Sequence, residues 1–219
     1  MSLYGEMRRS FEAEILDSGG HQPEILARAH RALSLTHSVL GNHAAILRAL
    51  RRDGQAVRSV LDIGCGHGGL LEKVRRQIGV EVLGVDLRPP ERCVGEFPIL
   101  RLDAVREVLP RADVAVCVCL VHHLRDEDFV GMIRNVGRTC RRFVILDLVR
   151  HRVPMVLFSA AAPLCLPRVN VLDGRQSIRR AYTPEEFRAS IARAVAGTDA
   201  KFRHTVAPFW IRQMADIRY

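Results

Sequence analysis

The stretch Val60-Leu61-Asp62-Ile63-Gly64-Cys65-Gly66-His67-Gly68-Gly69-Leu70-Leu71 decides the fold of this 219-residue chain. An apolar run that contains an acid is followed by glycines at alternating positions and then by a helical pattern. Glycine adopts positive φ readily and lets a ligand approach the backbone. The free N–H groups at the start of a helix can bind polar or anionic atoms. The stretch therefore predicts a strand, a tight turn and a helix that together bind a ligand.

A second acid follows the next apolar run. Residues 80–86 are predicted to form a strand that ends in Asp86, where an acid accepts hydrogen bonds from ribose hydroxyls in nucleotide-binding α/β folds. Together these features predict an adenosine-type cofactor. Gly64, Gly66 and Gly69 also match the dinucleotide spacing, with Asp86 near the expected offset of about 20 residues. These residues alone therefore leave a dinucleotide such as NAD(P) as an alternative cofactor.

The position of Asp62, two residues before the first glycine, favours one cofactor, because a dinucleotide-binding strand usually stays apolar there. The run Asp62-x-Gly64-x-Gly66-x-Gly68 resembles the first motif of the class I S-adenosylmethionine (SAM)-dependent methyltransferases. The resemblance implies that this run holds the aminoacyl end of SAM, Asp86 its ribose and Asp103 its adenine. The alternatives are a turn without a ligand and, for Asp103, a helix N-cap. The expected cofactor-binding residues are Asp62, Gly64, Cys65, Gly66, Gly68, Asp86, Leu87, Asp103, Ala104, Val118 and Cys119.

The predicted fourth strand, residues 112–118, leads into Leu120-Val121-His122-His123-Leu124. This segment is similar to that of small-molecule methyltransferases of the quinone-biosynthesis type. It lacks the Asn-Pro-Pro-Tyr sequence of amino-methylating enzymes, which disfavours a nitrogen acceptor. A hydroxyl acceptor must lose a proton, and a histidine with a reference pKa of about 6.5 can accept it. His122 and His123 are therefore the catalytic candidates, with His122 favoured as the base. A packing or capping role for each stays open.

Other polar residues are expected at the mouth of the site. Some follow the fifth strand, some lie in the N-terminal cap that would fold over the acceptor, and some belong to residues 151–182, which are expected to form an apolar lid. A surface or capping role is the alternative for each. The substrate-binding candidates are His37, His43, Asp147, Arg150, His151, Arg179 and Tyr182.

Alternating strands and helices predict one α/β domain over residues 1–219. The resemblance adds a Rossmann-like sheet of seven mainly parallel strands with an antiparallel last strand, and helices on both faces. The expected parts are a helical cap (1–53), a cofactor-binding core (57–150), the lid (151–182) and a final helix with a strand pair (183–219). Strands are predicted near 58–63, 80–86, 98–102, 112–118, 141–147, 200–206 and 209–217. Helices are predicted from Phe11 to Leu16, from Pro23 through Leu50 with a break at Gly41, and near 68–78, 87–95, 103–109, 125–138 and 184–196.

Net charge, aromatic content and cysteine spacing limit the classes of partner that the sequence predicts. The net charge of +9 comes mostly from arginines, which are scattered along the chain, some as adjacent pairs. A folded surface could gather them into a patch that favours acidic partners. With few aromatic residues between them, nucleic-acid binding is not favoured. None of the six cysteines forms a Cys-x-x-Cys pair, so no metal site and a reducing cytoplasm are expected. We expect neither a secretory signal nor a membrane span.

The sequence thus predicts a cytoplasmic SAM-dependent methyltransferase that acts on a hydroxyl of a small, largely apolar phenolic, polyketide or quinone-like metabolite of the kind found in secondary metabolism. A carbon acceptor on an electron-rich ring is the nearest alternative. An NAD(P)-dependent oxidoreductase and a non-catalytic SAM-fold binding module are the alternatives from other classes.

Overall fold

The computed structural model describes residues 7–18, 29, 32–33, 36–37, 39–52, 56–89 and 93–219. Seven strands form one sheet: β1 (Ser59–Ile63), β2 (Glu81–Asp86), β3 (Ile99–Arg101), β4 (Ala112–Val118), β5 (Cys140–Asp147), β6 (Lys201–Val206) and β7 (Gln213–Arg218). Their order is β3-β2-β1-β4-β5-β7-β6. Strand β7 is antiparallel to both of its neighbours, and the other pairs are parallel. The predicted fold class is confirmed.

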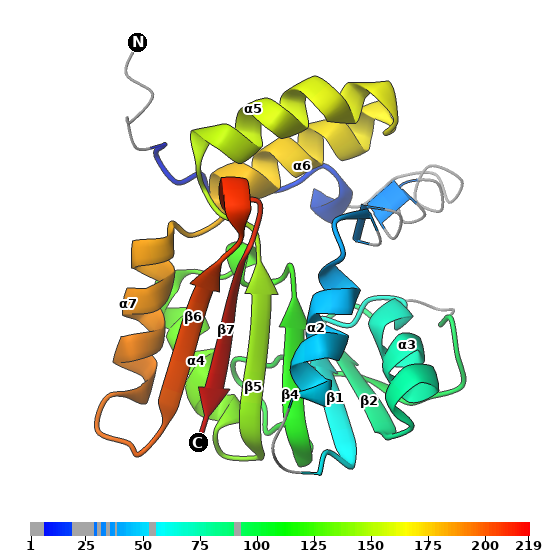
Figure 1. Ribbon diagram of the computed structural model, residues 1–219, viewed down its shortest axis with the longest axis vertical. Coiled ribbons are helices and arrows are strands. Elements are labelled where there is room, and N and C mark those ends of the chain that lie inside the picture. The colour runs from blue at the N-terminus through cyan, green and yellow to red at the C-terminus, as the bar shows by residue number, and fades with distance from the viewer. Residues whose placement is uncertain are drawn as a thin grey trace.

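Helices cover both faces of the sheet (Figure 1). The α-helices are α2 (Asn42–Arg51), α3 (Gly69–Ile78), α4 (Asp126–Val136), α5 (Arg152–Ala161), α6 (Arg168–Arg180) and α7 (Pro184–Val195). The first two pack apolar side chains such as Ile46 and Val74 on one face of β1, β4 and β5. Helices α4 and α7 pack Phe129 and Phe187 on the other face. Two separate apolar layers therefore hold the sheet from either side, as a parallel sheet requires.

The carboxyl ends of the central strands meet at one edge of the sheet. Ile63 at the end of β1 is in register with Val85 of β2 and with Cys117 of β4, which in turn pairs with Ile145 of β5. Strand order reverses between β1 and β4, and ligands of open α/β sheets bind at such a switch point. The glycine turn and the histidine pair follow β1 and β4, so both lie at this edge.

The lid predicted for residues 151–182 is a helical hairpin. Helices α5 and α6, joined through the short η3 (Ala162–Leu164), lie side by side above the carboxyl edge of the sheet (Figure 1). The sequence analysis assigns no helix to this stretch, in which Pro154, Pro163 and Pro167 interrupt the apolar residues. Pro163 and Pro167 instead stand at the first residues of η3 and just before α6, where the missing N–H costs nothing.

The first predicted helix is wrong. Residues 7–14 are irregular, and only a single turn, η1 (Leu16–Ser18), is helical. The N–H groups of Ile15 and Leu16 donate to the Asp173 carboxylate of α6 at 2.7 and 3.0 Å instead of to a preceding turn. Most of the predicted helix after Pro23 lies outside the described residues, and its last part is α2.

Two further helices are also wrong where the structure describes them. Residues 103–109 form a turn rather than a helix. The Asp103 carboxylate accepts a hydrogen bond from Val105 N–H, and the Asn135 side-chain amide donates to the carbonyl oxygens of Ala104 and Glu107. The stretch 87–95 is non-helical over its described residues. Pro89 and Pro90 occur in it, and proline disrupts a helix interior. The last strand begins at Gln213 rather than 209, after the short η4 (Pro208–Trp210).

The fold gathers arginines that are scattered in the sequence. A cleft of about 690 Å³ lies between α2 and strands β6 and β7. Its charged lining consists of Arg48, Arg52, Arg142, Lys201, Arg203, Arg212, Arg218 and a single acid, Asp216. None of the residues that line it belongs to the glycine turn or the histidine pair. Over the described part of the chain, no helix has the length and apolar character needed to cross a bilayer.

Candidate active site

The glycine turn has the backbone geometry that its sequence predicts. Gly64, Gly66 and Gly68 all have positive φ, of 72°, 51° and 78°. A Cβ on Gly64 would lie 2.9 Å from the Leu120 side chain, and a Cβ on Gly68 would lie 2.3 Å from the Phe97 ring. A Cβ on Gly66 would meet nothing within 4 Å. The turn is thus packed on two sides and open at its middle, where a ligand can reach the backbone.

Two acids flank this turn. Asp62 is buried, and burial, together with the charge of Asp86, raises its pKa to about 8. Asp86 accepts from Gly66 N–H at 2.9 Å with one oxygen and from Arg88 N–H at 2.8 Å with the other. Asp86 therefore shapes the turn itself. Asp62 stands at the turn as a buried carboxyl that a cationic ligand group would ionise.

His122 lies in η2 (Val121–His123), the single turn that follows β4, and is almost fully buried. Its Nδ1 is 2.7 Å from Oδ1 of Asp147, at the end of β5, and its backbone N–H donates to the other oxygen of that carboxylate at 3.0 Å. On the opposite side of the ring, Nε2 lies 3.6 Å from Oε1 of Glu14. The imidazole is held between two carboxylates that come from distant parts of the chain.

These contacts set the ionisation of the three groups. Burial lowers the pKa of His122, but the charges and hydrogen bonds of Asp147 and Glu14 outweigh it and raise that pKa to about 9. Burial opposes ionisation of both acids, yet their contacts with His122 bring the pKa of Asp147 and of Glu14 below the ordinary value. At neutral pH the arrangement is an imidazolium between two carboxylates.

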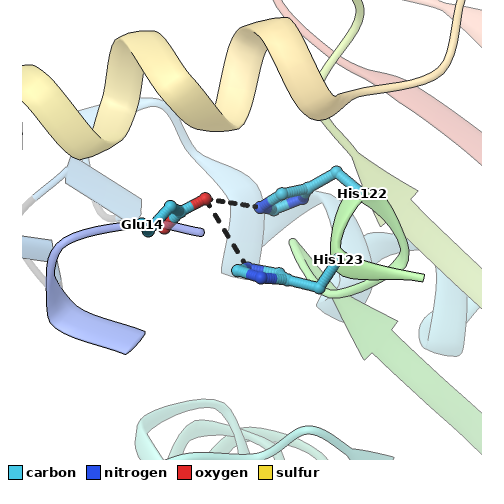
Figure 2. Close-up of side chains that lie close together, drawn as sticks. All are labelled: Glu14, His122 and His123. Atoms are coloured by element: carbon cyan, nitrogen blue, oxygen red, sulfur yellow. Dashed lines mark ion pairs between the residues drawn. The ribbon is translucent and has the colours of Figure 1, made fainter. Parts of the chain in front are cut away.

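His123 completes the cluster (Figure 2). Its Nε2 lies 3.8 Å from the same Glu14 oxygen, and its Nδ1 lies 3.3 Å from Oδ2 of Asp17. Glu14 and Asp17 come from the N-terminal segment, which runs along α6: Ser10 N–H donates to Arg179 O, and Ser177 Oγ donates to Glu14 Oε1 at 2.7 Å. The segment thus carries two acids onto the histidine pair.

The predicted cap residues His37 and His43 reach the same edge. Their rings stack at 5.6 Å, and burial is the main reason that the pKa of each is lowered, to about 4 for His43. Asn42 bridges His37 Nδ1 at 3.1 Å and the Cys119 sulfur at 3.9 Å. His43 lies beside Gly69 at the start of α3, and its buried Nδ1 has no hydrogen-bond partner among the described residues. A buried nitrogen in that position can bind a ligand atom.

Several predicted residues are engaged elsewhere in the fold. Asp103 closes a turn and pairs with Arg106 at 2.8 Å. The Arg150 guanidinium binds Met7 O, Ala181 O and the Glu186 carboxylate. His151 caps α5 and stacks on Trp210. Tyr182 is buried against Phe129, with its hydroxyl donating to Leu124 O.

The remaining predicted residues have less defined contacts. Arg179 is exposed and contributes its carbonyl to the N-terminal segment. Leu87 is exposed, and Ala104 gives its carbonyl to Asn135. Cys119, at the end of β4, has a positive φ of 53°, a conformation that costs energy outside glycine and often marks functional sites. The roles predicted for all of these residues stay predictions.

The sequence reasoning missed Glu14, Asp17 and Ser177. No local pattern marks them, because Glu14 and Asp17 stand in a segment with a helix-like apolar spacing and Ser177 stands in the stretch that is predicted to form an apolar lid. Glu14 lies between the apolar residues Phe11 and Ile15, and Asp17 directly follows Leu16.

Comparison with known families gives one match by sequence profile. Residues 27–151 match the profile of a family described as "Methyltransferase domain". A curated relative, a ubiquinone biosynthesis O-methyltransferase of Pseudomonas fluorescens, is 30% identical over a region that covers 42% of this chain and 42% of that protein. The chain therefore matches less than half the length of this relative.

Solved structures share the fold at low identity. The plantazolicin methyltransferase BpumL, in complex with a pentazolic desmethylPZN analog and SAH, superposes with a TM-score of 0.68 at 13% identity, covering 86% of this chain and 90% of that one. Magnesium protoporphyrin IX methyltransferase from Synechocystis PCC 6803 with bound SAH gives a TM-score of 0.53 at 16% identity, covering 91% and 89%. At these identities the likeness concerns the fold alone.

Proposed function

The chain belongs to the methyltransferase-domain family and is a SAM-dependent methyltransferase of the class I fold. From this premise we propose that it transfers the SAM methyl group to a hydroxyl of a small, largely apolar acceptor. The observation that carries the proposal is the placement of the glycine turn and the histidine–carboxylate cluster at the same edge of the sheet. The first offers a cofactor site and the second an acceptor site beside it.

The residues at the turn fit the cofactor. SAM carries an α-ammonium, an α-carboxylate, a ribose and an adenine. Asp62 would pair with the ammonium, backbone N–H groups at the start of α3 would bind the carboxylate, and Asp86 would accept from the ribose hydroxyls. A Cβ on Gly66 would meet nothing within 4 Å, and the buried Nδ1 of His43 has no hydrogen-bond partner among the described residues; both observations are consistent with a bound polar molecule.

The acceptor end is supported by the surroundings of His122. When bound, SAM supplies an activated methyl group on a sulfonium, so the protein must align the acceptor and exclude water. The acceptor oxygen would replace sulfur on the methyl group, S-adenosylhomocysteine would be the leaving group, and residues of this chain would have to take up or pass on the hydroxyl proton. The name of the curated relative, an O-methyltransferase, favours oxygen over carbon for this chain as well.

The hydroxyl proton needs a group that can receive it, and the sequence predicts His122 as that base. With its pKa raised to about 9, however, it holds a proton at neutral pH and has no lone pair to offer. We therefore propose that the cluster of His122, His123 and Glu14 acts on the acceptor as a unit, with Glu14 the carboxylate that faces both rings.

Calorimetry with the purified chain tests the cofactor assignment. S-adenosylhomocysteine is expected to bind with one site per chain and NADH not to bind. Asp86→Ala is expected to lower the affinity for S-adenosylhomocysteine about 10- to 100-fold, because hydrogen bonds to a charged group contribute about 1.5–3 kcal/mol. Binding of NADH without a response to S-adenosylhomocysteine would favour an oxidoreductase. Cofactor binding without methyl transfer to any of a panel of phenols and quinols would favour a non-catalytic module.

A second prediction concerns protons released on cofactor binding. Because the pKa of Asp62 is about 8 in the empty protein, about nine-tenths of this carboxyl is protonated at pH 7. Pairing with the cofactor ammonium should ionise it, so binding should release up to about one proton, and affinity should rise as pH increases towards 8. Calorimetry in two buffers of different ionisation enthalpy measures the release. Asp62→Asn should abolish it, and an equal release in that variant would place the cofactor ammonium elsewhere.

A further inference from the structure

Glu14, His122 and His123 present three potential metal-ligating atoms to one another (Figure 2). One ligand atom from each lies within 4.8 Å of the others. Glu14 Oε1 is 3.6 Å from Nε2 of His122 and 3.8 Å from Nε2 of His123. In a tetrahedral site with bonds of about 2.1 Å, ligand atoms stand about 3.4 Å apart. Small side-chain rotations would close the difference.

Each of the three ligands has a partner that orients it. Asp147 holds His122 through Nδ1 at 2.7 Å, and Asp17 lies 3.3 Å from Nδ1 of His123. A histidine whose Nδ1–H is bound by a carboxylate directs its Nε2 lone pair away from that carboxylate, and metal-ligating histidines almost always have such a partner. Ser177 Oγ donates to Glu14 Oε1, which keeps a second lone pair free. Both rings therefore aim Nε2 at the same glutamate oxygen.

The charges around this point favour a cation. Three carboxylates, from Glu14, Asp17 and Asp147, surround the two imidazoles. Two arginines act on Asp17: Nη1 of Arg180 lies 3.7 Å from its carboxylate, and the charges of Arg180 and Arg88 both help to lower its pKa. With both histidines neutral the cluster would carry an excess of negative charge in a largely buried place. A divalent cation bound to the two Nε2 atoms and Glu14 would balance it.

We propose that Glu14, His122 and His123 bind one divalent transition-metal cation of the Zn²⁺ class. Two imidazoles and one carboxylate form a donor set that suits Zn²⁺ and its neighbours better than Mg²⁺, which prefers oxygen ligands alone. His122 and Glu14 are 3% and 12% exposed, whereas His123 is 26% exposed. A fourth coordination position therefore opens on the His123 side, as in sites with three protein ligands and one exchangeable ligand.

The site would also deepen the proposed function, on which only this step rests. A cation held by these three residues would bind the acceptor oxygen at its open coordination position, orient it and lower the pKa of the acceptor hydroxyl. The hydroxyl proton could then be lost to water, and no neutral histidine would be needed as a base. The sequence alone indicates no such site, because Glu14 is brought to the histidines only by the hydrogen bonds of the N-terminal segment to α6.

The test uses the full chain after chelator treatment, titrated with Zn²⁺ against a competing chromophoric chelator. One high-affinity Zn²⁺ per chain is expected, and the Co²⁺-loaded protein should show visible d–d bands of four-coordinate N/O ligation. Asp17→Asn should lower the affinity for Zn²⁺ about 10- to 100-fold, as is typical of a residue that orients a ligand. Glu14→Gln and His123→Ala should each lower that affinity by at least as much. His204→Ala, which removes a histidine of β6 away from the cluster, should not alter the affinity.

Three results would overturn the inference: no Zn²⁺ binding, Zn²⁺ binding unchanged by Glu14→Gln and His123→Ala together, or binding of Mg²⁺ alone. The second would place the ion on other groups such as cysteine thiols. Binding of S-adenosylhomocysteine to the metal-free protein is measured in parallel. If it persists while Zn²⁺ binding fails, the metal site is wrong and the methyltransferase proposal stands. If Zn²⁺ binds and S-adenosylhomocysteine does not, the metal site stands and the methyltransferase proposal is wrong.

Discussion

Replacing His122 by alanine is expected to lower the turnover number of methyl transfer about 10²- to 10⁴-fold, because the cluster proposed to handle the acceptor proton loses its central residue and effects of this size are typical of lost proton transfer. The affinity for S-adenosylhomocysteine is expected to stay within about threefold. His122 is the residue that connects Asp147 to Glu14, so its loss removes the centre of the cluster. The hydrogen bond and ion pairs of its side chain are made with Asp147 and Glu14, which lie outside the glycine turn. Turnover at saturating SAM, with the affinity from calorimetry, measures the two effects separately.

A second substitution separates chemistry from packing at this position. His122→Asn can still place an N–H donor near Asp147, where the 2.7 Å contact of Nδ1 is made, but it lacks the Nε2 atom that faces Glu14. We expect His122→Asn to fold as the wild type does and to be as inactive as His122→Ala. Near-normal turnover in His122→Asn would show that the residue only supports Asp147 and the loop. His204→Ala serves here as the control histidine and should keep normal turnover.

The largest expected effect on stability comes from Asp216→Ala, which should lower the free energy of unfolding by about 3–5 kcal/mol. Asp216 of β7 binds Arg142 of β5 through two contacts, at 2.8 Å to Nε and 2.7 Å to Nη2. The Arg142 side chain is only 2% exposed, and its Nη2 also donates to Ala49 O of α2. Without the carboxylate a buried guanidinium would keep its charge without a bidentate partner, and such a charge is costly.

A matched pair on the surface provides the control. Glu127 and Arg193 join α4 to α7 at 3.0 Å, and both are largely exposed. Glu127→Ala should cost no more than about 1 kcal/mol, because solvent screens the pair. Urea denaturation of the two variants and the wild type measures the difference. A loss below about 1 kcal/mol in Asp216→Ala would mean that water reaches Arg142 and screens its charge.

Much of the fold could be predicted because its signals are local. The run from Val60 to Leu71 specifies a strand, a turn and a helix by apolar spacing and glycine placement, and all three occur within one or two residues of the predicted bounds. The capping sequence Thr183-Pro184-Glu185-Glu186 forms the capping box at the start of α7. In each case neighbouring residues supply the interactions that define the structure.

Two of the wrong helix predictions, at residues 11–16 and 103–109, share one physical cause, which is competition from distant partners. Residues 11–16 have the apolar spacing of a helix, but Asp173 binds the backbone N–H groups that a helix would use. Residues 103–109 could form a helical turn, but the Asn135 side chain takes two of their carbonyls. Intrinsic propensity is a weak preference that tertiary hydrogen bonds can outweigh, and no pattern along the chain announces those bonds.

The candidate site divides along the same line. The proposed cofactor half could be predicted from Asp62, the alternating glycines and Asp86, because a nucleotide site of this kind is built from one turn and the ends of two neighbouring strands. The acceptor half was decided by the tertiary structure. Only folding brings Asp147 of β5 and Glu14 and Asp17 of the N-terminal segment onto His122 and His123. Those three carboxylates convert a predicted neutral base into an imidazolium or, as we infer, a metal ligand, since the charge state of a buried group depends on what surrounds it in space.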